Sequence, residues 1–204
     1  MWPKIEYGPK RAIAAEEHRR IVALDTNIER RAFFELCWHL GGSQSDIANL
    51  AAENIDWSDW VIAYARRKTG SPAFIHFGPA IEAVLHSLPA KGLLFTRLAP
   101  MLEKHRAKEF KRLRVRLGIE GVSLHSYRYA WAERAKQCGY PERFAQEALG
   151  HNSIAVHAAS SRPCKSTLKQ SEARAPFAVG ITTNGYSFTY RSEIDSIYNI
   201  HSAF

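Results

Sequence analysis

The sequence predicts an α+β fold that is mainly helical and carries a small three-stranded antiparallel sheet. Apolar residues recur at helical spacing before residue 50 and again after residue 80, whereas between 55 and 77 they alternate as in short strands. Glycine and proline mark most of the boundaries between these segments. The chain has 204 residues, of which 46% are hydrophobic and 24% charged, so it can bury one sizeable core.

The first part of the chain predicts three helices. The first runs from Ala15 to Asn27 and has acids in its first turn, which suit the helix dipole. A second helix, over about 29–40, ends at Gly41-Gly42. Ser43 or Ser45 can then cap a short helix that ends near residue 50, because a hydroxyl there accepts hydrogen bonds from the free amides of the first turn.

The middle of the chain predicts the sheet. Apolar residues alternate from Ile55 through Trp57 to Ala63 and recur over 73–77, which predicts three short strands. The sequence Thr69-Gly70-Ser71-Pro72 supplies the turn between the second and third strands.

Helical periodicity returns after the sheet. A helix over about 81–88 ends at Pro89, and Leu93-Leu94-Phe95 then has the character of a buried segment. Gly118 marks the end of the next helix, and Gly139 and Pro141 separate the last two. These three predicted helices span about 102–117, 124–137 and 141–149.

The chain is predicted to divide near residue 157. Residues 1–157 form one domain, which opens with an extended lead-in over 1–12. Residues 158–204 lack sustained periodicity and are expected to form a poorly ordered tail. Within this tail, 186–190 alternate well enough to predict a short strand.

The charge of the chain indicates a polyanionic partner. Lys and Arg number 28 against 20 Asp and Glu, which gives a net charge of +8 and a pI near 9.5. One predicted helix, in which Glu109 is the only acid after residue 103, concentrates basic residues at Lys104, Arg106, Lys108, Lys111, Arg112, Arg114 and Arg116. The alternative is a solvated helix face without a partner.

The sequence predicts a cytoplasmic, nucleoid-associated protein with no membrane contact. Its first residues lack the apolar core of a signal peptide, and no apolar run approaches the ~20 residues that a bilayer span requires. Cys37, Cys138 and Cys164 lie far apart, without the paired spacing of a zinc site or a disulfide framework. A reducing compartment and the absence of a structural metal are therefore expected.

Three motifs follow one another along the chain: Lys68-Thr69-Gly70 at the predicted hairpin, His125-x-x-Arg128, and Leu149-Gly150-His151. In this order, with the basic helix after the first, they resemble the catalytic domain of the tyrosine recombinases, the phage integrase family, over about residues 11–157. The resemblance implies the fold of that domain, double-stranded DNA as substrate, and DNA recombination and integration through a 3′-phosphotyrosine link. It implies no cofactor and no metal, and it implies other recombinase protomers as further partners.

The resemblance also assigns roles to single residues. Lys68 is similar to the family's general-acid lysine, which protonates the leaving 5′ oxygen, and Arg128 to an arginine that binds the phosphate through two hydrogen bonds. His125 lies one helical turn before Arg128, and His151 is similar to the second histidine, which donates to the phosphate. The alternatives are an ordinary turn lysine, a surface His–Arg pair and a histidine that binds a carbonyl at a helix end.

Two positions depart from the family. Ser43 stands where the family has a further arginine, three residues before an acid that is Asp46 here. The loss of that cation costs about 3 kcal/mol of transition-state stabilisation. Ser160 stands nine residues after His151, where the family has its nucleophilic tyrosine. A serine hydroxyl is less acidic and shorter than a phenol, so Ser160 is a poor nucleophile. The possible substitutes, which lie far from this position, are Tyr186, Tyr190 and Tyr198.

These departures predict a degenerate or truncated recombinase-like DNA-binding protein with weak or no strand-transfer activity. A frameshift or truncation that replaced the native end would explain why the resemblance stops before the tyrosine. The alternative is a regulatory DNA-binding module that partners an intact recombinase and receives a tyrosine from it. A metal-dependent nuclease is disfavoured, because the nine histidines show no ligand spacing.

Overall fold

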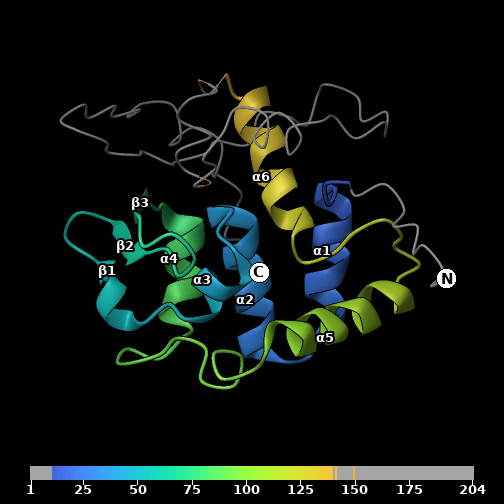
Figure 1. Ribbon diagram of the computed structural model, residues 1–204, viewed down its shortest axis with the longest axis horizontal. Helices are drawn as coiled ribbons and strands as arrows, with labels where there is room; N and C mark the ends of the chain where they lie inside the picture. Colours follow the sequence, from blue (N-terminus) through green and yellow to red (C-terminus); the bar gives the residue numbers. More distant parts are fainter. Residues whose placement is uncertain (1–10, 140, 142–148, 150–204) are drawn as a thin grey trace, which may run out of the picture.

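The computed structural model describes residues 11–139, 141 and 149, and it confirms a mainly helical fold with one small sheet (Figure 1). The predicted tail with its strand at 186–190, most of the lead-in, and the interior of the predicted helix over 141–149 lie outside the described residues. A short 3-10 helix covers Ala52–Asn54. The other elements are α1 (Ala15–Leu24), α2 (Ile28–Leu40), α3 (Gln44–Ala48), β1 (Ile55–Asp56), β2 (Val61–Ala65), β3 (Pro72–His76), α4 (Pro79–His86), α5 (Glu103–Arg116) and α6 (Ser126–Gln137).

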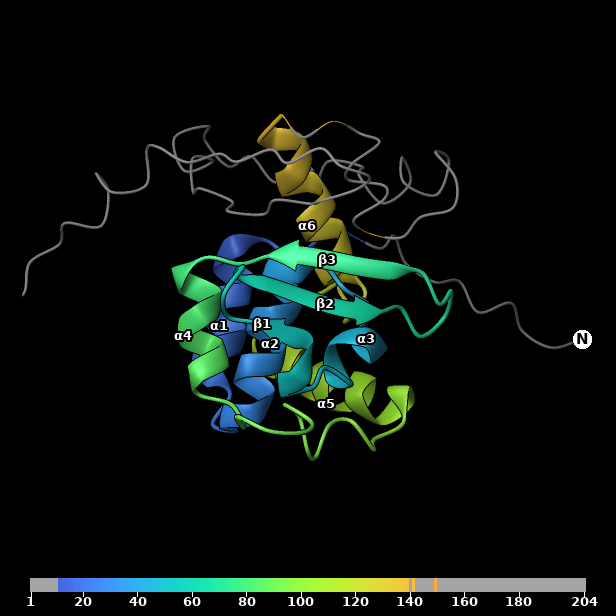
Figure 2. The same ribbon diagram turned by 90° about the vertical axis from the view of Figure 1, so that its left-hand side faces the viewer.

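The sheet is antiparallel in the order β1-β2-β3, and β2 pairs with β3 from Val61↔His76 to Ala65↔Pro72. The turn between β2 and β3 is closed where the N–H of Arg66 donates to the carbonyl of Ser71 at 2.9 Å. Gly70 in this turn has a φ of +68°, a conformation that glycine adopts without steric cost. Figure 2 shows the hairpin extending toward the side of the molecule where α3 lies.

Side-chain caps begin α2 and α3, and the end of α1 differs from the prediction. α1 stops at Leu24 instead of continuing to Asn27, because two side chains bind the backbone between α1 and α2. Asp25 Oδ1 accepts from the N–H of Asn27 at 3.0 Å, and Asn27 Oδ1 accepts from the N–H of Arg30 at 2.8 Å as the N-cap of α2. The short helix α3 is capped by Ser43 and not by Ser45.

Two apolar residues are more exposed than their sequence pattern predicted. Leu94 and Phe95 are buried as expected, but Leu93 is 42% exposed; its backbone forms an isolated bridge with Ala51. Trp57, predicted in a strand, lies in the turn after β1 and is 43% exposed.

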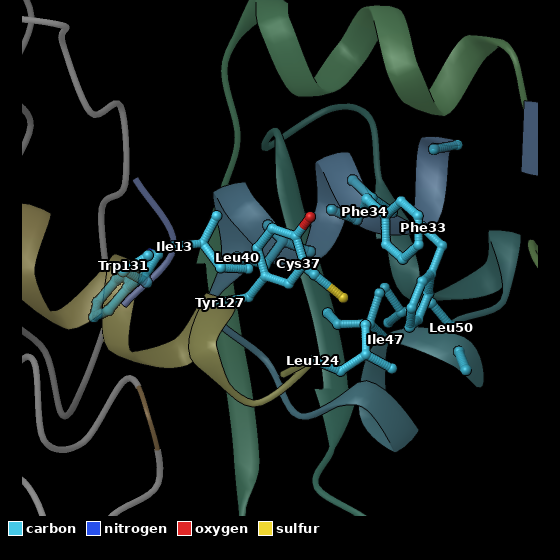
Figure 3. Packing of buried hydrophobic residues seen from close by; sticks show 14 of the residues in the cluster. Ile13, Phe33, Phe34, Cys37, Leu40, Ile47, Leu50, Leu124, Tyr127 and Trp131 are labelled. Carbon is cyan, nitrogen blue, oxygen red and sulfur yellow. The ribbon is translucent and has the colours of Figure 1, made fainter. Parts of the chain in front are cut away.

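The core is built around α2 and joins it to α5 and α6. Phe34 of α2 lies against Phe110 of α5, with ring centroids 5.6 Å apart, and stacks on Tyr127 of α6 at 6.1 Å. Figure 3 shows side chains of α2, α3 and α6 meeting in this core. Trp131, one turn after Tyr127, is also buried, and its Nε1 donates to the carbonyl of His39 at 3.1 Å. This packing fixes the first turns of α6 against the C-terminal end of α2.

A polar cluster lies where α1, α2 and α6 meet. The buried ring of His18 is 3.1 Å from Glu35 through Nε2 and 3.4 Å from the hydroxyl of Tyr127 through Nδ1. The same ring stacks on Trp38 at 4.5 Å, and the guanidinium of Arg134 lies 3.4 Å from the centre of the Trp38 ring. Such contacts between a cation and an indole face are favourable.

His39 lies beside this cluster, 3.7 Å from Glu35, and its burial predicts that the free energy of unfolding falls as the pH drops from 7 to 5. Burial lowers the pKa of His39 to about 4, although the charge of Glu35, 3.7 Å away, opposes the shift. The unfolded histidine has a pKa near 6.5, so in this window the unfolded state binds more protons and is stabilised relative to the folded state as the pH falls. The His39 side chain is 29% exposed, and we expect a loss of about 1 kcal/mol after solvent screening.

Urea unfolding of the wild type and of His39→Gln at pH 7 and pH 5 measures this loss. Glu35 stays ionised over this range, because the hydrogen bond and charge of His18 lower the pKa of Glu35 even though burial raises it. The variant should therefore lose less stability than the wild type between the two pH values. Equal losses in both proteins would contradict the assignment to His39.

Candidate functional site

Ser43 lies in a tight junction between α2 and α3. α2 ends at Gly41, which has a φ of +62° and where a Cβ would lie 2.6 Å from Cγ of Trp131. Ser43 follows as the N-cap of α3, and its Oγ accepts from the N–H of Asp46 at 3.1 Å. The hydroxyl at position 43 is therefore engaged by the protein's own backbone.

Asp46 joins the hairpin that carries Lys68 to this junction. The Asp46 side chain is buried, and its Oδ1 accepts from the backbone N–H of Arg67 at 2.9 Å. Lys68 is the next residue and is exposed in the turn. The structure thus places Lys68 one residue from the hydrogen bond that holds the hairpin against the first turn of α3.

Arg128 meets the junction from the first turn of α6. It is buried; its Nη1 donates to the carbonyl of Gly41 at 3.0 Å, and its Nη2 donates to the carbonyl of Leu149. Burial lowers the pKa of Arg128, while the negative charge of Asp46 opposes the shift. The guanidinium therefore links the end of α2, the start of α6 and the helical residue Leu149.

The sequence motifs did not single out Tyr64, which also lies at the junction. Its hydroxyl is 3.1 Å from the place that a Cβ on Gly42 would occupy. Burial and the charge of Asp46 raise the pKa of Tyr64 to about 12, so the phenol is neutral at physiological pH. The available signal was the alternation of β2, in which Tyr64 shares the inner face of the sheet with the buried Ile62.

His125 lies at the N-cap position of α6 and is exposed, unlike Arg128. Its ring packs edge to face against Tyr129, with 4.9 Å between the centroids. The two motif residues are adjacent along the helix, since the carbonyl of His125 accepts from the N–H of Arg128 at 3.0 Å. Their side chains nevertheless differ in exposure, so the first faces solvent and the second faces the junction.

The basic helix α5 presents most of its cations to solvent, and one of them inward. Arg106 is buried; it donates to the carbonyl of Leu98 at 2.8 Å and to Oγ of Ser45 at 3.1 Å. Arg114 is half-buried and donates to the carbonyl of Ile119 at 3.1 Å. The exposed cations of α5 are Lys104, Lys108, Lys111, Arg112 and Arg116.

The acid in the middle of α5 turns toward the interior. Glu109 Oε2 accepts from Nη1 of Arg30 at 3.0 Å, and the same guanidinium binds the buried carboxylate of Asp25 through Nη2 at 2.7 Å. Arg30 therefore pairs with both carboxylates and draws Glu109 away from the exposed cations of the helix. The exposed face of α5 after Glu103 carries cations without a neighbouring acid on the helix.

Ser43, Lys68 and Arg128 are brought around one junction, because Gly41 binds Arg128 and Asp46 binds both Ser43 and the hairpin. The first turn of α5 reaches the same place through Ser45, whose hydroxyl accepts from Arg106 and donates to Glu103. His151 and Ser160 lie outside the described residues, so their placement stays a prediction.

Two further properties were searched in the part of the chain that the structure describes. Over residues 11–139, 141 and 149, no three His, Cys, Asp or Glu side chains group closely enough to hold a metal ion. Over the same residues, we find no helix with the length and apolar character of a bilayer span.

Three solved structures share this fold. The XerA recombinase is 19% identical, with a TM-score of 0.65 over 81% of this chain and 63% of that chain. An integrase from mycobacterium phage Brujita is 17% identical, with a TM-score of 0.62 over 82% of this chain and 63% of that chain. Lambda integrase, solved as a dimer bound to a COC′ core site, is 20% identical, with a TM-score of 0.63 over 80% of this chain and 65% of that chain. The chain thus spans less than two thirds of the length of these proteins.

At the level of sequence, the chain matches a family model but no single curated protein. A search of curated proteins finds no match. The family model of the phage integrase family matches residues 11–159, a range that contains the junction, α5 and all three motifs. The chain therefore belongs to the phage integrase family, the tyrosine recombinases.

Proposed function

We propose that this protein binds double-stranded DNA through the exposed cations of α5 and through the junction of Ser43, Lys68 and Arg128. The one-sided charge of α5 carries this proposal. Lys104 and its neighbours along the helix face solvent, while Glu109 is half-buried and paired with Arg30 of α2. Lys and Arg that neutralise phosphates supply most of the sequence-independent affinity for DNA. Lambda integrase, which shares the fold, was solved bound to DNA.

We further propose that the protein has weak or no strand-transfer activity of its own. Ser43 has no charge, and its hydroxyl accepts a backbone hydrogen bond at the N-terminus of α3. A developing phosphorane would therefore be bound by fewer cations than the family provides, and one lost charged donor costs about 100-fold or more in rate. Ser160 at the nucleophile position adds a second loss, because a serine hydroxyl is less acidic and shorter than a phenol.

The binding half of this proposal predicts a steep dependence on salt. If the exposed cations of α5 each neutralise one phosphate, the slope of log K against log salt is about −4.5 from this helix alone. Replacing Lys104, Lys108, Lys111, Arg112 and Arg116 together with glutamine should remove most of that slope and weaken binding about 100-fold or more. Fluorescence anisotropy with a labelled duplex over a range of salt concentrations measures both quantities.

The double variant Arg19→Gln, Arg31→Gln is the matched control, since both residues are exposed cations on other helices. It should bind DNA about as tightly as the wild type. Affinity of the wild type that does not change with salt would refute DNA binding through α5.

Denaturing gels of the protein mixed with a nicked duplex test the catalytic half of the proposal. Rapid formation of a covalent protein–DNA product would refute the proposal that strand-transfer activity is weak or absent. A product that forms only with an added intact recombinase would favour the regulatory alternative.

A further inference from the structure

Arg67 is held beside the place where the family has an arginine and this chain has Ser43. Its backbone N–H donates to the buried Oδ1 of Asp46 at 2.9 Å, and the N–H of Asp46 in turn donates to Oγ of Ser43 at 3.1 Å. Two hydrogen bonds through a single aspartate therefore connect the backbone of Arg67 to position 43. The position of Arg67 is fixed by the fold and not by the turn alone.

The side chain of Arg67 is exposed. Burial lowers the pKa of Arg106, whose guanidinium donates to Ser45 in α3; the charge of Glu103 opposes this shift, and the charge of Arg67 adds to it. The ion pairs found within the described residues do not include Arg67. Like charges that act on each other repel, and an anion bound at Arg67 would relieve the part of this repulsion that Glu103 does not offset.

The neighbours of Arg67 in the hairpin are less suited to this task. Arg66 donates across the turn to the carbonyl of Pro72 at 2.7 Å and to Oγ of Ser71 at 3.3 Å, so its guanidinium is engaged within the hairpin. Lys68 presents a single ammonium at the turn, and it lacks the planar group that binds two phosphate oxygens at once. Arg67 combines such a group with exposure and a fixed backbone.

We propose that Arg67 binds a DNA phosphate at the α3 edge of the junction, in place of the arginine that Ser43 does not supply. This inference rests on the proposed DNA-binding function and adds to it a phosphate-binding residue for which no sequence motif gave a signal. The anion is one phosphodiester group of the bound duplex, held by the guanidinium through charge-assisted hydrogen bonds.

A double-mutant cycle on DNA affinity tests whether Arg67 and position 43 serve the same phosphate. Arg67→Gln alone should weaken binding roughly tenfold and reduce the slope of log K against log salt by about 1. Ser43→Arg should place a second cation beside the same phosphate. In that background, the loss of Arg67 should therefore matter less, and Arg67→Gln should weaken binding by less than about threefold. Equal losses in both backgrounds, or no loss from Arg67→Gln alone, would overturn the inference.

Arg116→Gln is the matched control. Arg116 lies at the far end of α5, about 15 Å along the helix from Arg106, and its replacement should weaken binding equally in the wild type and in the Ser43→Arg variant. If Arg116→Gln weakens binding and Arg67→Gln does not, the inference about Arg67 fails while the proposed DNA binding stands. If neither residue matters and affinity is independent of salt, the proposed function itself fails.

A further variant keeps the test decisive if Ser43→Arg does not fold, since Ser43 caps α3. Arg67→Lys keeps the charge but loses the planar donors, so it should weaken binding about as much as Arg67→Gln at a two-oxygen site. The salt slope of Arg67→Lys should stay near that of the wild type. Wild-type affinity in Arg67→Lys would overturn the inference.

Discussion

Replacing Arg128 with methionine is expected to lower the free energy of unfolding by about 3 kcal/mol. The guanidinium is buried and donates to the carbonyls of Gly41 and Leu149, which come from segments far apart in the sequence. Methionine fills similar space but donates no hydrogen bond, so both carbonyls would lose their donor inside the protein. Urea unfolding followed by tryptophan fluorescence measures the loss, since Trp131 lies one turn further along α6.

Two controls separate the geometry of Arg128 from its charge. Arg112→Met makes the same chemical change at an exposed position of α5 and should change stability by less than about 0.5 kcal/mol. Arg128→Lys keeps a cation at the junction but cannot reach two carbonyls with one planar group, so it should recover only part of the loss. A loss below about 1 kcal/mol in Arg128→Met would show that the two hydrogen bonds do not hold the junction together.

The hydrogen bonds that Arg128 makes within the fold are compatible with the phosphate contact proposed for it. A guanidinium has more N–H donors than the two bonds to Gly41 and Leu149 use, so the same group can hold the fold and a phosphate. In the proposed complex, the protein bonds would also keep the cation in place before DNA binds, which reduces the entropy that binding must remove. The resemblance to the family implied only the phosphate role, because a sequence motif does not show which carbonyls a side chain reaches.

Local signals in the sequence predicted most of the fold correctly. Gly41 and Gly70 supply the left-handed backbone at a helix end and a hairpin turn, and Ser43 supplies a cap, all within a few residues of the structure that they specify. The end of α1 was wrong for a related reason. Helical periodicity alone cannot show that Asp25 and Asn27 bind the backbone and end the helix early.

The candidate site was harder to predict, because its hydrogen bonds join distant segments. The bond from Arg67 to Asp46 spans 21 residues, and the bond from Arg128 to Gly41 spans 87. No local pattern encodes such a pair. The inward direction of Arg106, by contrast, was available from periodicity, because it shares one face of α5 with the buried Phe110 and Leu113. The number of basic residues in this segment does not show which of them lie on the buried face of the helix.

Replacing Gly41 with alanine is expected to lower the free energy of unfolding by about 2–5 kcal/mol. Part of the cost is the φ of +62°, which residues with a Cβ rarely adopt, and this part is about 1–2 kcal/mol. The rest is contact, because the new Cβ would lie 2.6 Å from Cγ and 2.9 Å from Cβ of Trp131, a buried residue of α6. Overpacking of this kind costs about 1–3 kcal/mol.

Gly118→Ala separates the two contributions in the same protein. Gly118 has a φ of +65° but nothing within 4 Å of the place that its Cβ would take, so only the backbone cost of about 1–2 kcal/mol applies. Equal losses in the two variants would mean that Trp131 moves aside freely. A larger loss at Gly41 means that α6 is held tightly against the end of α2. That contact also determines where the Gly41 carbonyl meets Arg128, so Gly41→Ala should weaken DNA binding as well, whereas Gly118→Ala should not.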